Sequence, residues 1–143
     1  MEELLRKADI DAELRNNIQE IIWKKFLFIS SLATTTSYYN QTIGQVLQSE
    51  ISRKFLVSLM KQANDIALAK GILLGESVIS ELLELMSNFP FEAKTSMQLD
   101  FESGNYTEIG ALTEYVVLEG KKLGIATPDY KKAFRVLKSR LMV

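Results

Sequence analysis

A chain of 143 residues with 47% hydrophobic and 24% charged residues is long enough to bury one core and too short for two ordinary domains. It contains no cysteine and no histidine, which excludes disulfides, thiolate or imidazole metal sites and serine–histidine triads built from this chain alone. Without these ligands we expect no metal site. The formal net charge of -1 at pH 7 provides no general attraction to a phosphate backbone, so we also expect no nucleic-acid partner.

The sequence predicts no membrane segment. The N-terminal residues lack the basic and then apolar order of a secretory signal, and the most apolar stretch, residues 26–33, is too short to cross a bilayer. We therefore expect a cytoplasmic protein that does not contact a membrane.

The first predicted helix covers residues 11–37. Its apolar positions recur at helical spacing, with one stripe made of Ile18, Ile22, Lys25, Ile29 and Ala33. The consecutive residues 26–28 are all apolar, so the second half of this helix is apolar nearly all round. This pattern predicts a buried helix at the centre of a bundle.

Further helices follow at residues 49–70 and 76–88, after a polar connection at residues 39–44. Gly71 is placed to end the first of them in a left-handed conformation, and Pro90 prevents the second from continuing. The apolar face of the 49–70 helix is expected to consist of Ile51, Phe55, Leu59, Ala63, Ile66 and Ala67.

A short helix is expected at residues 95–102, and Asn105 or Thr107 is expected to cap another that reaches Gly120 or Leu123. Thr127 followed by Pro128 predicts the start of a last helix, through about residue 141. No strand-like alternation is present. Residues 1–143 are thus predicted to form one all-α domain, a multi-helix bundle.

Four short segments stand out in chain order: residues 22–26 (Ile-Trp-Lys-Lys-Phe), 95–100 (Thr-Ser-Met-Gln-Leu-Asp), 106–109 (Tyr-Thr-Glu-Ile) and 121–128 (Lys-Lys-Leu-Gly-Ile-Ala-Thr-Pro). In this order they resemble the C-terminal domain of the ketopantoate reductase (2-dehydropantoate 2-reductase) family. The first is similar to its tryptophan followed two residues later by a lysine, and the second and third to its serine-methionine and threonine-glutamate-isoleucine segments. The last is similar to its closing glycine-isoleucine-x-threonine-proline, so the resemblance covers most of the chain.

This resemblance implies a helical domain similar to the C-terminal domain of 6-phosphogluconate dehydrogenase-like enzymes. It also implies an NADPH-dependent oxidoreductase that reduces a 2-keto acid, as ketopantoate is reduced to pantoate in pantothenate biosynthesis. The sequence has no glycine-rich turn between a strand and a helix, so a missing N-terminal Rossmann domain is expected to bind the cofactor, and this chain alone is expected to be inactive.

The resemblance also implies the site residues: Lys25 and Glu108 as catalytic residues, and Ser96 and Asp100 as substrate-binding residues. Hydride attack on a ketone leaves an alkoxide that needs a proton or a cation, and without histidine an ammonium is the best candidate. Lys25 is expected to be partly desolvated on its stripe, with Glu108 close enough to orient it.

Structural explanations exist for the same residues. Lys25 could place its charge in water, Ser96 could cap a helix, and Glu108 could favour a helix N-terminus. Asp100 could equally face solvent. Trp23 is expected to pack rather than to bind substrate. The basic residues near the C-terminus are expected to form a solvated face: Lys121, Lys122, Lys131, Lys132, Arg135, Lys138 and Arg140.

The sequence departs from the family pattern where ketopantoate would be bound. Asparagines of the family are replaced by four apolar residues, Ile29, Ala33, Ile43 and Ala93, and the aspartate after glutamate-isoleucine is replaced by Gly110. A pocket without those amides cannot pair a substrate's polar groups in the same way. We therefore expect a more apolar 2-keto acid as substrate.

The alternative interpretation is a helical interaction or dimerisation module without chemistry, in which Lys25 and Glu108 form only a structural ion pair. Both interpretations predict an exposed apolar surface. The N-terminal Rossmann domain or a second copy in a homodimer would cover this surface.

Overall fold

The computed structural model describes the backbone of residues 2–141 and the side chains of residues 17–141. Within that part the chain is all-α and has no strand, as predicted. The elements are α1 (Glu2–Tyr39), α2 (Ile43–Gln48), α3 (Glu50–Ala69), α4 (Val78–Ser87), α5 (Ser96–Ser103), the π-helical segment η1 (Gly110–Glu114), α6 (Tyr115–Leu123) and α7 (Pro128–Leu141).

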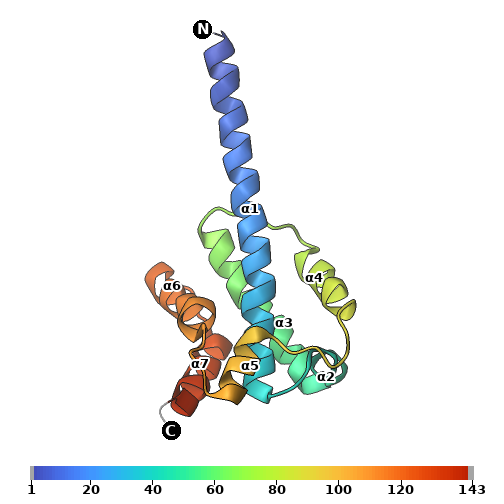
Figure 1. Cartoon of the computed structure of the whole chain (residues 1–143). Helices are drawn as coiled ribbons and strands as arrows, with labels where there is room; N and C mark the ends of the chain where they lie inside the picture. Colours follow the sequence, from blue (N-terminus) through green and yellow to red (C-terminus); the bar gives the residue numbers. More distant parts are fainter. Residues whose placement is uncertain (1, 142–143) are drawn as a thin grey trace.

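Helix α1 is the axis around which the other helices are arranged (Figure 1). Its C-terminal half lies inside the bundle, with α4 on one side, α6 and α7 on the other, and α5 crossing its lower part. Its N-terminal half extends well beyond the bundle. No helix in the part of the chain that the structure describes is long and apolar enough to cross a bilayer.

The predicted buried spine is confirmed, but the buried surface of α1 is rich in hydroxyl groups. Residues 30–37 are all buried, and six of these eight are serine or threonine. Ser31 Oγ donates to Leu27 O at 2.6 Å, and Thr35 Oγ1 donates to Ser31 O at 2.7 Å. Because these hydroxyls bond to carbonyls one turn back, they can be buried without loss of hydrogen bonds.

The predicted stripe of α1 is only partly correct. Ala33 is buried, whereas Ile18 and Ile22 are 53% and 58% exposed. In α3, Ile51 is also exposed although it was expected on the buried face. These isoleucines are on turns of α1 and α3 whose outer side faces no other described element, and periodicity alone does not reveal this.

Three helices differ from the prediction. Helix α1 begins at Glu2 and not at residue 11. Helix α2 was not predicted; it begins within the expected polar connection, where Thr42 and Gln45 form a reciprocal capping box. The helix expected after Asn105 or Thr107 begins instead at Ile109, and the buried Thr107 hydroxyl has no hydrogen-bond partner in the structure. Its first turns are π-helical, a geometry that is rare and often found at functional sites.

Other boundaries are confirmed. Ser49 caps α3, Gly71 follows that helix with φ +79°, and Thr95 caps α5 by accepting from the Gln98 backbone. Helix α7 starts at Pro128, as the threonine-proline pair predicted.

Candidate functional site

Lys25 and Ile29 lie on a strip of α1 between two packed faces. On one side Lys24 Nζ donates to Glu81 Oε2 of α4 at 2.8 Å. On the other side Ser30 Oγ donates to Leu112 O, and the hydroxyls of Thr34 and Thr113 are 2.8 Å apart, both contacts being with η1. Since successive helix residues turn by about 100°, Lys25 and Ile29 point between α4 and η1.

A groove of about 420 Å³ runs along the α4 side of this strip. Its walls are mostly apolar, and its lining consists of Ile21, Lys24, Lys25, Phe28, Ile29, Leu82 and Leu85. The only charged groups among these residues are two neighbouring ammonium groups. The groove can therefore hold an apolar group next to a cation.

The two lysines of the groove differ in their partners. Lys24 is bound to Glu81, and its hydrogen bond is the main reason why the pKa of the Glu81 carboxyl is lowered. Lys25 takes part in none of the hydrogen bonds or salt bridges found among residues 17–141. Lys25 is consequently the cation of the groove that is available to a ligand.

The structure differs from the expected environment of Lys25. Its side chain is exposed, because no other described element covers the strip, so the expected desolvation is absent. Nor does it form a salt bridge with Glu108 within the described residues. Glu108 is also exposed and directly precedes Ile109, which packs in one apolar cluster with Ala33 of α1.

Ser96 and Asp100 lie on α5, at the lower end of the strip. Ser96 is the first residue of the helix and is exposed, and Asp100 is half-buried. Helix α5 is held against α1 by a 2.8 Å contact between the hydroxyls of Thr36 and Thr95. Thr36 is eleven residues beyond Lys25, which corresponds to about 16 Å of helix. The structure thus brings the four predicted residues to neighbouring elements but not into contact.

Trp23 packs as predicted. Its ring lies 5.3 Å from that of Phe26 and 6.4 Å from that of Tyr115, and Lys70 Nζ lies 5.8 Å above it. Burial alone would lower the pKa of Lys70, but the hydrogen bond with Glu119 and the interaction with Tyr115 raise it above its usual value. These aromatic side chains pack α1 against α6.

The four apolar positions at which the resemblance implies asparagines have different environments. Ile29 lines the groove, whereas Ala33 and Ile43 are 3% and 4% exposed and belong to the core. Ile43 N donates to Ala93 O at 2.8 Å, so these two positions meet through their backbones. Of the four replacements, Ile29 is the one that changes the groove itself.

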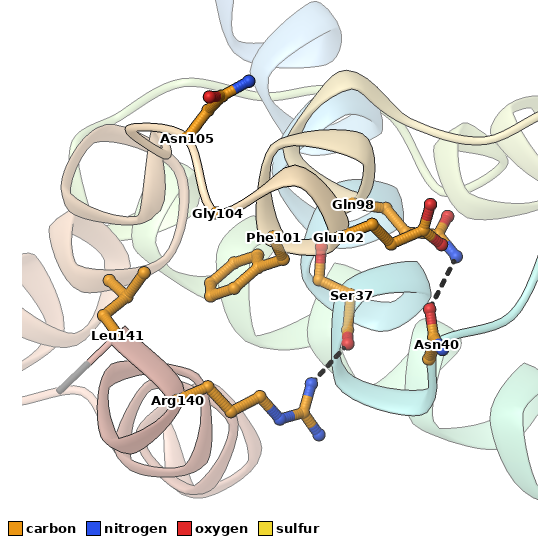
Figure 2. A pocket seen from close by; sticks show the side chains of 9 residues that line it. All are labelled: Ser37, Asn40, Gln98, Phe101, Glu102, Gly104, Asn105, Arg140 and Leu141. Carbon is orange, nitrogen blue, oxygen red and sulfur yellow. Dashed lines mark hydrogen bonds between the residues drawn. The ribbon is translucent and has the colours of Figure 1, made fainter. Parts of the chain in front are cut away.

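A separate cavity of about 520 Å³ lies at the C-terminal end of α1, between α5 and α7 (Figure 2). There Arg140 donates to Ser37 O at 2.7 Å and to Tyr38 O at 2.9 Å, and it satisfies carbonyls at the end of α1. Arg140 is therefore not simply part of the solvated basic face that the sequence predicted. None of the four predicted site residues lines this cavity.

Sequence reasoning missed the wall of the groove formed by α4. Leu82 and Leu85 belong to the helix expected at residues 76–88, but nothing local indicates that this helix packs beside Lys24, which pairs with Glu81 57 residues later in the chain. Within the described part of the chain, no group of three or more acidic side chains could hold a metal ion.

Comparison with known proteins identifies the family. Residues 17–140 match the family described as "Ketopantoate reductase PanE/ApbA C terminal". The chain is 28% identical over 127 residues to a 2-dehydropantoate 2-reductase of Streptococcus pyogenes, covering 88% of this chain and 41% of the relative.

Solved structures have the same fold. A dimeric ketopantoate reductase from Staphylococcus aureus matches with a TM-score of 0.81 and 21% identity, over 87% of this chain and 43% of that one. A D-mandelate dehydrogenase solved with NADH and anilino(oxo)acetate matches with a TM-score of 0.77 and 16% identity, over 88% and 42%. The chain spans less than half the length of these relatives.

Proposed function

Because the chain belongs to the ketopantoate reductase family, we propose that it is the substrate-side domain of an NADPH-dependent 2-keto acid reductase. The observation that carries the proposal is Lys25, an ammonium without a partner in the described structure, placed beside an apolar groove. The activity belongs to the whole protein, since this chain corresponds to 41–43% of the relatives' length.

The cofactor would be held mainly by an N-terminal Rossmann domain. The described residues contain no strand and therefore no strand-to-helix turn that could bind a pyrophosphate. Bound there, NADPH would supply the hydride. Ile18, Ile21 and Ile22, all more than half exposed next to Lys25, are suited to be covered by such a domain.

In this proposal Lys25 donates a proton to the carbonyl oxygen as the hydride reaches the carbonyl carbon, and a 2-hydroxy acid results. An ammonium aimed at the oxygen stabilises the charge that develops on it. Covering the strip with a second domain would desolvate Lys25 and strengthen this interaction. Glu108 would then orient the ammonium, Ser96 would donate a hydrogen bond to the substrate carboxylate, and Asp100 would line the same end of the site.

The groove of this chain is less suited to binding ketopantoate, because it lacks side-chain amides as partners for the substrate. Ile29 offers no amide in the groove, and Ala33 and Ile43 are closed off in the core. The fold also occurs in the D-mandelate dehydrogenase solved with anilino(oxo)acetate, an aromatic 2-keto acid derivative. We therefore propose that the protein reduces a 2-keto acid more apolar than ketopantoate.

The adjacent lysines allow a matched test in the full-length protein. Replacing Lys25→Met should lower kcat/KM for 2-keto acid reduction by about 100-fold or more, because the proton donor is lost. Replacing Lys24→Met removes an equal charge one residue away together with the ion pair to Glu81, so it should lower kcat/KM by about 10-fold or less. Steady-state oxidation of NADPH measures both, and equal activity of the two variants would refute the role of Lys25.

A further inference from the structure

We propose that the groove between α1 and α4 binds the side chain of the 2-keto acid, and that α4 therefore selects substrates with a large aromatic or branched apolar substituent. This inference rests on the proposed function, because it takes Lys25 as the group that meets the carbonyl oxygen. It assigns a specificity role to Phe28, Leu82 and Leu85.

The position of the groove supports this assignment. Lys25 and Ile29 line it together with Leu82 and Leu85 of α4. A 2-keto acid carries its substituent on the same carbon as the carbonyl oxygen. A carbonyl oxygen held by Lys25 therefore brings that substituent within reach of the α4 leucines.

The chemistry of the groove determines which substituents fit. Apart from the two ammonium groups, its lining is aliphatic and aromatic, and one of those ammonium groups is already bound to Glu81. A hydroxyl on the substituent would lose its bonds to water and find no acceptor among these side chains. A volume of about 420 Å³ is within the range of about 300–1,000 Å³ typical of small-molecule sites.

The wall formed by α4 is held in place by side chains that belong to the core: Val78, Leu82 and Met86. At the surface near its N-terminal end, Glu81 also accepts from Lys24 at 2.8 Å. Beyond its C-terminal end, the ring of Phe89 lies 5.9 Å from that of Phe28. A fixed wall can discriminate between substituents by size and polarity, because it does not adjust to each of them.

Leu85 allows the inference to be tested without disturbing the core. It is 50% exposed in the groove, whereas Leu82 is 2% exposed and supports the fold. The experiment compares kcat/KM of the full-length protein for phenylglyoxylate, 4-methyl-2-oxopentanoate and pyruvate. We expect each of the two larger acids to exceed pyruvate by about 10- to 100-fold, since each buried methylene contributes to discrimination.

The variant Leu85→Gln should reduce kcat/KM for phenylglyoxylate by about 10-fold and leave that for pyruvate nearly unchanged. Leu118→Gln is the matched control, because Leu118 is 56% exposed on α6 and does not line the groove. Circular dichroism and thermal unfolding verify that both variants are folded.

The outcomes separate the two proposals. Equal use of pyruvate and the larger acids, together with an equal effect of Leu85→Gln on all of them, would overturn the assignment of the groove and leave 2-keto acid reduction intact. Failure to reduce any of the three acids, or ketopantoate, with either NADPH or NADH would overturn the proposed function and with it this inference.

Discussion

The described side chains of α1 form an upper half, residues 17–25, and a lower half, residues 26–39, and these halves contrast in burial. Between residues 17 and 25, Ile18, Ile21 and Ile22 are 53%, 66% and 58% exposed. Between residues 30 and 37, serine and threonine predominate and every residue is buried. Large apolar side chains are thus exposed in the first segment, whereas small hydroxyl side chains are buried in the second.

This contrast shows that the surroundings of a helix decide what it buries. The hydroxyls of the lower half bond to carbonyls one turn back or to η1 and α7, so their burial leaves few unpaired groups. The isoleucines of the upper half are more than half exposed, although Ile21 borders the groove beside α4. Their exposure marks the surface that we assign to a second domain.

The largest expected loss of stability comes from truncating a buried apolar residue of the lower half, and truncating an exposed one of the upper half is the comparison. Leu27→Ala should lower the free energy of unfolding by about 2–5 kcal/mol, because Leu27 is fully buried. Ile21→Ala, at an exposed position, should change it by no more than about 0.5 kcal/mol in this chain. Urea unfolding followed by circular dichroism measures both, and similar losses would mean that the upper half is packed in solution.

A smaller effect is expected from the hydroxyl pairs of the lower half. Thr34→Val leaves the buried hydroxyl of Thr113 without its partner and should cost about 1–3 kcal/mol. Adding Thr113→Val removes the orphaned group, so the double variant should lose less than the sum of the single ones. A double-mutant cycle by urea unfolding tests this, and strict additivity would argue against the hydrogen bond.

The smallest effect should come from the ion pair at the boundary between the two halves. Lys24→Met removes the hydrogen bond that lowers the pKa of Glu81. A lowered carboxyl pKa stabilises the fold above the ordinary value of 4.5, and this contribution disappears as the pH falls through the lowered value.

The variant should therefore have a slightly lower urea midpoint than the wild type at pH 7 and low salt. The difference should vanish in strong acid, and high salt should reduce it because both partners are about half exposed. A difference that persists unchanged in acid would show that Lys24 acts through packing rather than charge.

The sequence alone determined the fold class and most helices. Helical periodicity, Gly71, Pro90 and the threonine-proline pair at Thr127–Pro128 are local signals, so an all-α bundle with a buried central helix could be predicted. The order of its short motifs was enough to identify the family, which comparison confirms, and to nominate Lys25, Glu108, Ser96 and Asp100 as site residues.

Only the tertiary structure decided which surfaces meet. The pairing of Lys24 with Glu81, the groove between Lys25 and Leu85, and the contacts of α1 with η1 join residues 57 to 82 positions apart. Such contacts depend on how whole helices pack, and the spacing of residues within one helix carries no information about its neighbours. The same limit explains why Ile18 and Ile22, which are exposed, were predicted to lie on the stripe of a buried helix.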